Sequence, residues 1–368
     1  MTKKNDDLTQ IIADNLNKLS DEDKVAFRLG LDRDAPTLFT DFISTGSSIL
    51  DIAISNRKNG GIACGRITEL QGLEGTGKSL IAAHLLKNTQ KRGGVAVLID
   101  TETAVNEEFF EAVGLDMRKG IYVNENRLEH IFTFIENIIE TVRKSDKDRL
   151  VTIVVDSVSG ATTESEAEAD HGVAGYATDK ALIMGKALRK ITKMIGDQKV
   201  ALVFTNQLRM KMNAMPFADQ YTTSGGKAMA YHTSTRIRLA IAGEIKDPTT
   251  KQCIGVKCKA KVIKNRLGPP KRVAEFVILF DRGIDDYNSW YEAMKVHQLF
   301  GGSVQAPTWT DPDTQEVFKF KKSTFVSVLL SDKERCLKVY NQIADAKIMH
   351  YAEKSQLVDY LEVPSTGE

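Results

Sequence analysis

The most informative stretch of this chain is GRITELQGLEGTGKS, residues 65–79. Its first half contains a predicted β-strand, Ile67 to Gln71, and a helical pattern opens at Lys78. Between them lies the spacing G-x-x-x-x-G-K-[ST], whose three glycines let backbone N–H groups curl toward phosphate oxygens. The N-terminus of the following helix adds its partial positive charge. The segment therefore predicts a phosphate-binding loop made of Gly72, Leu73, Glu74, Gly75, Thr76, Gly77, Lys78 and Ser79.

The loop predicts a nucleotide with a bound metal ion. Lys78 would reach the β- and γ-phosphates, and the Ser79 hydroxyl would bind Mg²⁺. Asp156 closes the apolar run VTIVVD (residues 151–156), where a carboxylate can complete the Mg²⁺ shell from a neighbouring strand. Ser79 and Asp156 are therefore the expected metal ligands.

Two further strand ends carry polar side chains suited to hydrolysis. Glu102 follows the run VAVLID (residues 95–100) and is the candidate for polarising an attacking water. Asn206 and Gln207 follow VALVFT (residues 200–205), where an amide could sense a terminal phosphate by hydrogen bonding. Because ligands gather at the carboxyl edge of open parallel sheets, these side chains are expected beside the phosphate-binding loop.

The chain is expected to have an α/β fold with a mainly parallel, twisted sheet covered by helices. Short β-rich runs alternate with longer helical stretches from Phe39 to about Gly283, as parallel sheets require. Residues 9–29 carry apolar positions at helical spacing. We expect a helical oligomerisation arm with its linker (1–38), a core (39–284) and a small α+β C-terminal lobe (285–368).

The composition of the chain excludes some classes of protein but does not identify the function. With 50 Lys plus Arg against 49 Asp plus Glu, any nucleic-acid surface must come from local placement of basic residues. The cysteines at 64, 253, 258 and 336 match neither a zinc knuckle nor a disulfide framework. No apolar run is long enough to cross a bilayer, and the start MTKKNDDLTQ has no signal-peptide pattern. The expected location is the cytoplasm.

Seven blocks of sequence resemble one known family. They are STGSSILDIAI (44–54), GRITELQGLEGTGKS (65–79), LIDTE (98–102), VVDSV (154–158), FTNQLRMKM (204–212), TTSGGKA (222–228) and VIKNRLGPP (262–270). Together they resemble the bacterial RecA family and its phage relatives, over roughly two-thirds of the chain. The resemblance implies a RecA-type ATPase core that uses ATP and Mg²⁺. It also implies helical filaments on single-stranded DNA, DNA-stimulated hydrolysis and strand exchange with homologous double-stranded DNA.

Within that resemblance, several residues take specific roles at the nucleotide. Carried over position by position, it implies Glu102 as the catalytic glutamate, Asp156 as the Walker B aspartate and Gln207 as the link between nucleotide and DNA. Asn106 and Phe109 fall where family members contact and stack on the adenine. A place in the core is the alternative for Phe109.

Lys264 and Arg266 match the pair that family filaments extend across the subunit boundary to the neighbour's γ-phosphate. Such cations stabilise charge in the transition state. Assembly would then complete the active site, and the N-terminal arm would dock on a neighbouring subunit in a non-closing contact. Single-strand-binding and mediator proteins are further expected partners. The C-terminal tail resembles that of the phage relatives, and a phage protein would be located in the cytoplasm of the host.

Two segments match the family's DNA-binding loops. The first, 164–176, precedes a helix that carries Lys186, Arg189 and Lys190. The second is predicted as a loop over 208–224. Its basic groups would neutralise phosphates while Met212 could wedge between bases. The expected contacts there are Arg209, Lys211, Met212, Met215, Phe217, Thr222, Thr223, Ser224, Gly225, Gly226 and Lys227.

Three alternative functions remain open at this point. A ring helicase or another motor could use the same ATPase core, and closed rings seen by electron microscopy would favour it. A recombination mediator could bind ATP without turnover, although an intact Glu102 disfavours this. A small-molecule kinase would need an acceptor-binding segment, for which the sequence offers no candidate.

Overall fold

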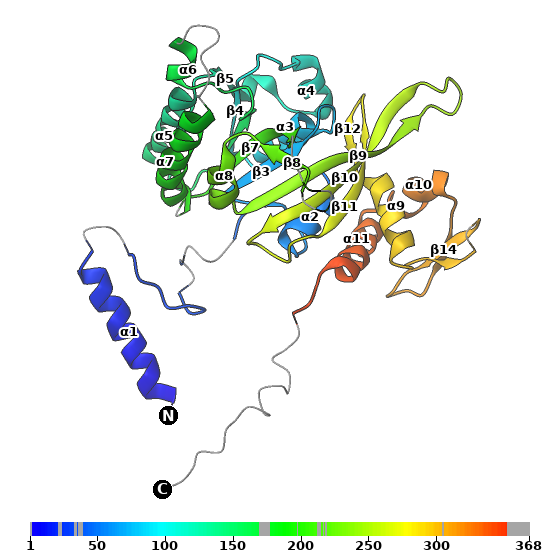
Figure 1. Ribbon diagram of the computed structural model, residues 1–368. Coiled ribbons are helices and arrows are strands. Elements are labelled where there is room, and N and C mark those ends of the chain that lie inside the picture. Colours follow the sequence, from blue (N-terminus) through cyan, green and yellow to red (C-terminus); the bar gives the residue numbers. More distant parts are fainter. Residues whose placement is uncertain are drawn as a thin grey trace.

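A ten-stranded sheet forms the centre of the computed structural model (Figure 1). The structure describes residues 2–20, 24–32, 35, 40–168, 177–196, 198–211, 215, 217, 219–303 and 305–351. The parallel part contains, in spatial order, β9 (Thr235–Lys246), β3 (Arg66–Gly72), β7 (Val200–Met210), β6 (Val151–Asp156), β4 (Val95–Asp100) and β5 (Gly120–Asn124). The antiparallel part adds β10 (Cys253–Asn265), β11 (Val273–Leu279) and β12 (Gly283–Asp285) beyond β9, and β8 (Tyr221–Thr223) pairs with β7. The expected mainly parallel α/β sheet is thus confirmed.

Helices cover both faces of the central parallel strands, which explains why β4, β6 and the first half of β7 are nearly continuous apolar runs. One face packs its buried residues against α3 (Lys78–Lys91) and α4 (Glu107–Val113). The other packs against α5 (Leu128–Ser145) and α7 (Ala177–Gly196), whose buried residues repeat at helical spacing. Alternate residues of one strand therefore belong to different clusters: Leu98 lies in the first and Val97 in the second. Figure 1 shows α5 and α7 side by side at the left of the view.

Shorter elements complete the core. They are β1 (Phe42–Ile43), α2 (Ser48–Ser55), β2 (Ile62–Ala63), the 3₁₀ helix η1 (Met117–Lys119), α6 (Glu164–Glu168) and α8 (Gly226–His232). Helix α2 packs against β11, and α8 packs against α7. The β9–β10 hairpin projects beyond the body of the molecule at the upper right of Figure 1.

The C-terminal part joins helices to a small three-stranded sheet. It contains α9 (Asp286–Val296), β13 (Gly301–Gly302), β14 (Pro307–Thr310), β15 (Val317–Lys319), η2 (Lys322–Thr324), α10 (Phe325–Leu329) and α11 (Lys333–Lys347). Its buried Trp290 and Trp309 belong to the same apolar cluster as α2 and α3. The lobe is therefore continuous with the core packing, and the boundary at residue 285 stays a prediction.

The N-terminal arm differs from the expected helix over residues 9–29. Helix α1 spans Thr2–Lys18, and residues 24–29 are not helical. The Asn17 side chain explains the reversal, because its Oδ1 accepts from the backbone N–H groups of Val25 (2.8 Å) and Ala26 (2.7 Å). Its Nδ2 donates to the Ala26 carbonyl at 3.1 Å. The Asn17 side chain thus satisfies backbone groups of the returning segment, which would otherwise be satisfied by further helical turns.

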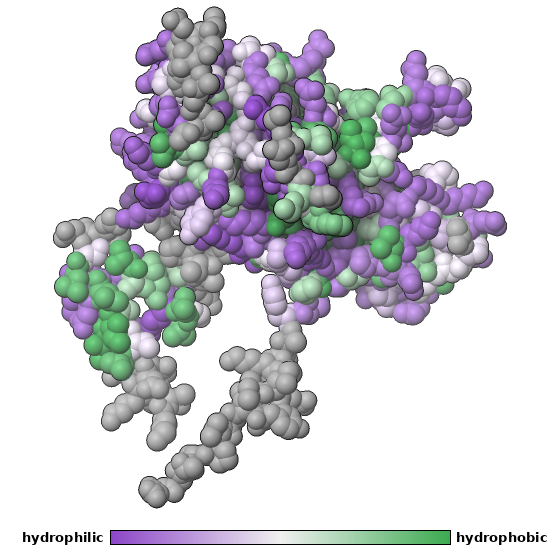
Figure 2. All heavy atoms as spheres, viewed as in Figure 1, coloured by the Kyte–Doolittle hydropathy of each residue, from purple (hydrophilic) through white to green (hydrophobic). Residues whose placement is uncertain are grey.

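Helix α1 lies apart from the core and exposes an apolar side (Figures 1 and 2). About half of each large apolar side chain on it is accessible: Leu8, Ile11, Ile12 and Leu16. Isolated chains seldom leave such a stripe uncovered, so this stripe is suited to contact with another surface. None of the helices in the described ranges has the length and apolar content needed to cross a membrane.

Candidate functional site

The phosphate-binding loop lies where β3 ends and α3 begins, as predicted. Gly75 and Gly77 have φ values of 69° and 92°, a left-handed backbone that a residue with a Cβ adopts only at a cost. Gly72 is required for a different reason, because a Cβ there would lie 2.3 Å from the Thr76 hydroxyl. The Thr76 hydroxyl donates to the Leu73 carbonyl at 2.8 Å and closes the turn.

Lys78 is folded over this loop. Its Nζ donates to the carbonyls of Gly72 (3.1 Å) and Leu73 (2.8 Å). Burial lowers the pKa of the Lys78 amine, while Asp156, Glu102 and the loop's own glutamate raise it in part. The ammonium group therefore lies among the residues expected to bind phosphate, and an anion in the loop would satisfy it better than two carbonyls do.

Two carboxylates lie at the same sheet edge. Asp156 ends β6, and the Thr205 hydroxyl donates to its Oδ1 at 2.5 Å. Glu102 is exposed just beyond β4, and the Ser157 hydroxyl donates to its Oε1 at 2.5 Å. Strands β4 and β6 are in parallel register with Asp100 opposite Asp156, which brings the two carboxylate-bearing ends together. The register of β4 with β6 thus agrees with the prediction that Glu102 and Asp156 lie at the same edge of the sheet.

Asp100 has a structural role that the sequence reading missed. It is 2% exposed and accepts hydrogen bonds from the backbone N–H groups of Glu102 (3.0 Å) and Ala104 (3.0 Å). It also accepts from the Val105 N–H (3.2 Å) and the Tyr122 hydroxyl (3.2 Å). A buried carboxylate at the end of a strand, two residues before the candidate base, was the available signal. Asp100 fixes the backbone from which Glu102 projects.

The adenine candidates flank this edge. Asn106 is the N-cap of α4 and accepts from the Phe109 N–H at 3.0 Å. Phe109 is half-buried and packs against the core cluster, which is the alternative left open by the sequence.

Ser79 and Glu74 are both exposed, Ser79 in the first turn of α3 and Glu74 in the loop. Hydroxyl, carboxylate and ammonium groups at one edge form a donor set that fits a magnesium–nucleotide complex.

The end of β7 carries a hydrogen-bonded network. The Gln207 N–H donates to the Ser159 hydroxyl at 2.9 Å, and that hydroxyl donates to Asn206 Oδ1 at 2.9 Å. Asn206 is fully buried, and its Nδ2 donates to Glu69 Oε1 (2.9 Å) and to the Ser224 carbonyl (2.9 Å). Gln207 lies opposite Gly72 in the register of β7 with β3. The network therefore joins the nucleotide edge to the segment that precedes α8.

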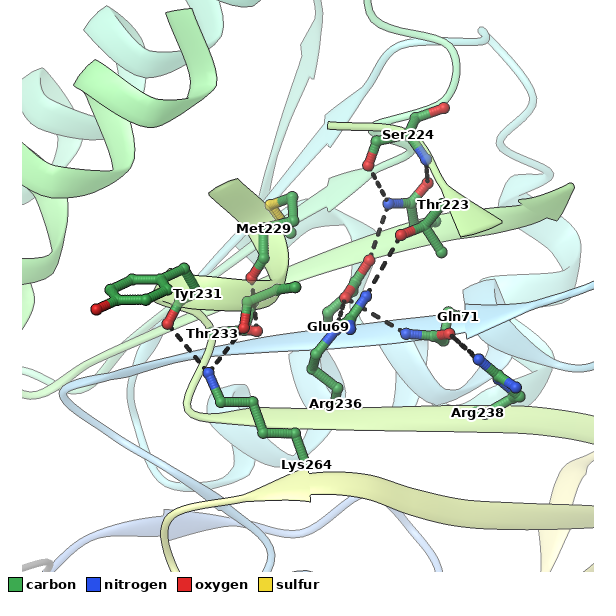
Figure 3. Close-up of polar contacts among 12 residues, drawn as sticks. Glu69, Gln71, Thr223, Ser224, Met229, Tyr231, Thr233, Arg236, Arg238 and Lys264 are labelled. Carbon is green, nitrogen blue, oxygen red and sulfur yellow. Dashed lines mark hydrogen bonds and ion pairs between the residues drawn. The ribbon is translucent and has the colours of Figure 1, made fainter. Parts of the chain in front are cut away.

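Glu69 is the buried centre of that network. It is fully buried and accepts from Arg236 Nε at 2.5 Å (Figure 3). Arg236 also donates to the Thr223 hydroxyl at 3.3 Å. Neither Glu69 nor Arg236 was singled out from the sequence, although a charged residue in the middle of a predicted strand was the signal for Glu69.

The second DNA-loop prediction is corrected in part. Leu208 to Met210 continue β7, and Tyr221 to Thr223 form β8, so both ends of the predicted loop are a hairpin. Cross-strand pairs such as Arg209 with Thr222 explain this, because each residue completes the other's backbone hydrogen bonds. Lys211 and Lys227 are exposed, as are 77% of Met215 and all of Phe217. Met212 lies outside the described residues.

Gly225 and Gly226 follow the hairpin with φ values of 82° and 58° and lead into α8. On α7, Lys186 and Arg189 are exposed, and Lys190 donates to Glu136 at 2.6 Å. The first DNA loop falls largely on residues 169–176, which are outside the described part of the chain.

Lys264 and Arg266 do not reach the phosphate-binding loop of their own chain. Lys264 lies opposite Arg236, which lies opposite Glu69, three residues before Gly72 or about 10 Å along β3. Its Nζ donates to the carbonyls of Ala230 (2.8 Å) and Tyr231 (3.0 Å) at the end of α8 (Figure 3). Burial, followed by the nearby Arg266 and Arg236, lowers the pKa of Lys264 to about 8.

Comparison with known proteins identifies the family. The family model described as RecA N-terminal domain matches residues 15–285. Protein RecA of Helicobacter pylori strain G27 is 37% identical over 244 residues, which cover 66% of this chain and 67% of that protein. Protein RecA of Campylobacter hominis shows the same identity and coverage. Protein RecA of Synechococcus sp. strain CC9902 is 35% identical over 257 residues, 70% of this chain and 64% of that protein. This chain therefore belongs to the RecA family of recombination proteins, whose members use ATP with Mg²⁺.

Proposed function

We propose that this protein assembles into helical filaments on single-stranded DNA, hydrolyses ATP when DNA is bound, and exchanges strands with homologous double-stranded DNA. The observation that supports this most directly is the network from Gln207 through Asn206 to Ser224. It starts at the edge that carries the phosphate-binding loop and ends at the base of the hairpin proposed to hold DNA. One rigid set of hydrogen bonds thus borders both sites.

At the nucleotide, each residue of the chain has a distinct proposed task. The loop N–H groups and Lys78 bind phosphate oxygens, while Ser79 and Asp156 are the residues that would hold Mg²⁺. ATP supplies the transferred γ-phosphoryl group, and the metal ion supplies charge neutralisation. Glu102 orients the attacking water and accepts its proton, and the Ser157 hydroxyl fixes the carboxylate that does so.

The positions of Lys264 and Arg266 support a site shared between subunits. Both lie at the opposite end of the β3–β9 pair from the loop, so within one chain they cannot contact the γ-phosphate. We propose that they act on the nucleotide of the adjacent subunit. Lys264 would then exchange its two carbonyl partners at the C-terminal end of α8 for phosphate.

The proposal that subunits assemble is supported by two exposed apolar surfaces. The exposed side of α1 includes Ile12 and Leu16. The edge strand β5 leaves Ile121 and Tyr122 about half exposed, beside a small apolar hollow lined by Leu98. A strand at the edge of a sheet with exposed apolar side chains is a natural place for another chain to pack. We propose that the arm of one subunit covers the core of the next.

Binding of a second DNA segment is supported by a row of basic side chains on β10. Lys257, Lys259 and Lys261 alternate with buried residues and are all exposed on one face of the sheet. The row lies on the same face as Arg236 and Arg238, which are paired with β10 in register. We propose it as a phosphate-contacting surface for duplex DNA, and mediator proteins and a cytoplasmic location remain further expectations.

The test is ATP hydrolysis with and without single-stranded DNA, run beside strand exchange between a circular single strand and a linear duplex. DNA-stimulated hydrolysis together with joint-molecule formation supports the proposal. Hydrolysis that ignores DNA, or closed rings by electron microscopy, would favour another motor of the same fold.

A further inference from the structure

The loop end of the β7–β8 hairpin holds an acidic residue, Asp219, against the main sheet. The backbone N–H of Lys211 donates to the Gln220 carbonyl at 2.8 Å, and Lys211 Nζ donates to the Asp219 carbonyl at 2.9 Å. These bonds extend the hairpin by one step and fix where Asp219 leaves it. Its side chain, half-exposed, points to Arg238 on β9.

The contact between Asp219 and Arg238 is bidentate. Arg238 Nη1 donates to Oδ1 at 3.0 Å, and Nη2 donates to Oδ2 at 2.7 Å. The hydrogen bonds from Arg238 hold the pKa of Asp219 below its ordinary value. Arg238 also donates from Nε and Nη2 to Gln71 Oε1 at 3.3 Å, and its guanidinium lies 5.8 Å from the centre of the Tyr221 ring (Figure 3 shows the Gln71 contact). The guanidinium of Arg238 is therefore bound on one side by Gln71 of the sheet and on the other by Asp219 of the hairpin.

Arg238 and Arg236 lie on the same face of β9 but have different partners. Arg236 is bound to Glu69, which is fully buried on a central strand and cannot move away. Arg238 is bound to an acid that is 51% exposed and belongs to the hairpin that carries the proposed DNA loop. Lys261 lies directly opposite Arg238 on β10, so a second cation faces the same space. Of these two arginines, Arg238 is the one whose acidic partner can leave without a change in the central sheet.

We propose that Arg238 binds a DNA phosphate and that the Asp219 carboxylate occupies the phosphate position when DNA is absent. This inference rests on the proposed binding of single-stranded DNA. A phosphate accepts the same pair of parallel N–H bonds from a guanidinium as a carboxylate does. Gln71 and Tyr221 keep the guanidinium oriented during the exchange, so the arginine is ready for a phosphate as soon as the loop moves. The loop thereby competes with DNA for one of its own binding residues.

Asp219→Asn removes the competitor without changing its size. An exposed ion pair contributes about 0.2–1 kcal/mol, so the affinity for a fluorescent oligothymidylate in the presence of ATP should rise between roughly 1.5-fold and fivefold. The matched control is Asp281→Asn, which removes a bidentate partner of Arg282 that is 63% exposed, with the same change of charge. This control should leave the affinity within experimental error of the wild type.

Arg238→Gln gives the second half of the test. It should lower the affinity and reduce the salt dependence of log K by about 0.7, the value for one phosphate contact on a single strand. In the Arg238→Gln background, Asp219→Asn should have no further effect, since the residue it competes for is gone. Thermal unfolding of each variant confirms that it is folded before affinities are compared.

The outcomes separate this inference from the proposed function. A wild type that does not bind the oligonucleotide contradicts the proposed function itself. Wild-type binding with Asp219→Asn no tighter than Asp281→Asn overturns only the role of Asp219. An increase that persists in the Arg238→Gln background overturns the exchange at Arg238, because the effect would then be a general one of net charge.

Discussion

Replacing Glu69 with glutamine should destabilise the protein and uncouple its two sites. The glutamate is fully buried, and its two oxygens serve different donors: Oε1 accepts from Asn206 and Oε2 from Arg236. A glutamine has one acceptor, so it can satisfy only one of these two and must turn its own N–H₂ toward the other. The Arg236 side chain, 17% exposed, would keep its charge without a compensating carboxylate.

The size of the effect follows from that geometry. Breaking a buried ion pair by removing one partner costs about 3–5 kcal/mol. Because one hydrogen bond survives and Arg236 keeps some solvent contact, we expect the lower end, about 3 kcal/mol. For a chain of this length the entropy of unfolding is about 0.8 kcal/mol/K, so Tm should fall by about 4 °C. DNA stimulation of hydrolysis should fall as well, since Asn206 loses the contact that fixes it beneath Ser224.

Differential scanning calorimetry measures the change, with Glu275→Gln as the matched control. Glu275 pairs with Lys259 at 3.3 Å, and both side chains are more than half exposed, so this variant should shift Tm by less than about 1 °C. The double variant of Glu69→Gln with Arg236→Gln should recover part of the loss, because a neutral pair replaces an unpaired charge. Equal shifts for Glu69→Gln and Glu275→Gln would refute the reasoning.

Three further predictions test other parts of the account. Glu102→Gln should reduce the rate of ATP hydrolysis by about 10²- to 10⁴-fold while equilibrium binding of a fluorescent ATP analogue is retained, and loss of both would show that Glu102 acts in binding. Replacing Ile12 and Leu16 together with aspartate should give a folded monomer by sedimentation velocity, whereas filaments of normal length would contradict docking by α1. Burial, with Lys87 and Lys91, lowers the pKa of His84 to about 4, so the histidine is neutral in the folded chain and favours unfolding as pH falls from 6.5 toward 4. The free energy of unfolding should therefore decrease by up to about 3 kcal/mol between pH 6.5 and pH 4. In chemical unfolding measured across this pH range, His84→Gln should show a smaller decrease than the wild type, and an equal decrease would assign the effect to another group.

The sequence predicted the central sheet well because its strands are apolar on both faces. The predicted runs 95–100 and 151–156 match β4 and β6 residue for residue. Glu102 and Asp156 follow directly from these runs, since parallel strands place their carboxyl ends at one edge. The phosphate-binding loop was equally readable, because its glycines are demanded by local backbone geometry.

The features that the sequence did not predict depend on contacts between distant residues. The helix expected over 9–29 ends at Lys18, since Asn17 satisfies the backbone of Val25 and Ala26, and spacing alone does not contain that bond. Glu69 and Arg236 are 167 positions apart in the chain, and only the register of β3 with β9 brings them together. The ion pair between Asp219 and Arg238 likewise joins the hairpin to β9, and the residue spacing alone does not contain it.

The central claim is that two subunits build one active site, and it is tested most directly by mixing two inactive variants. Lys264→Ala removes the cation proposed to act on the neighbour, and Glu102→Gln removes the carboxylate proposed to act within the chain. Each alone should lack DNA-stimulated ATP hydrolysis. Mixed in equal amounts on single-stranded DNA, they should recover activity, because about a quarter of the random interfaces in a head-to-tail filament would hold an intact pair. A mixture as inactive as its components, or a Lys264→Ala variant that DNA still stimulates, would contradict the shared site.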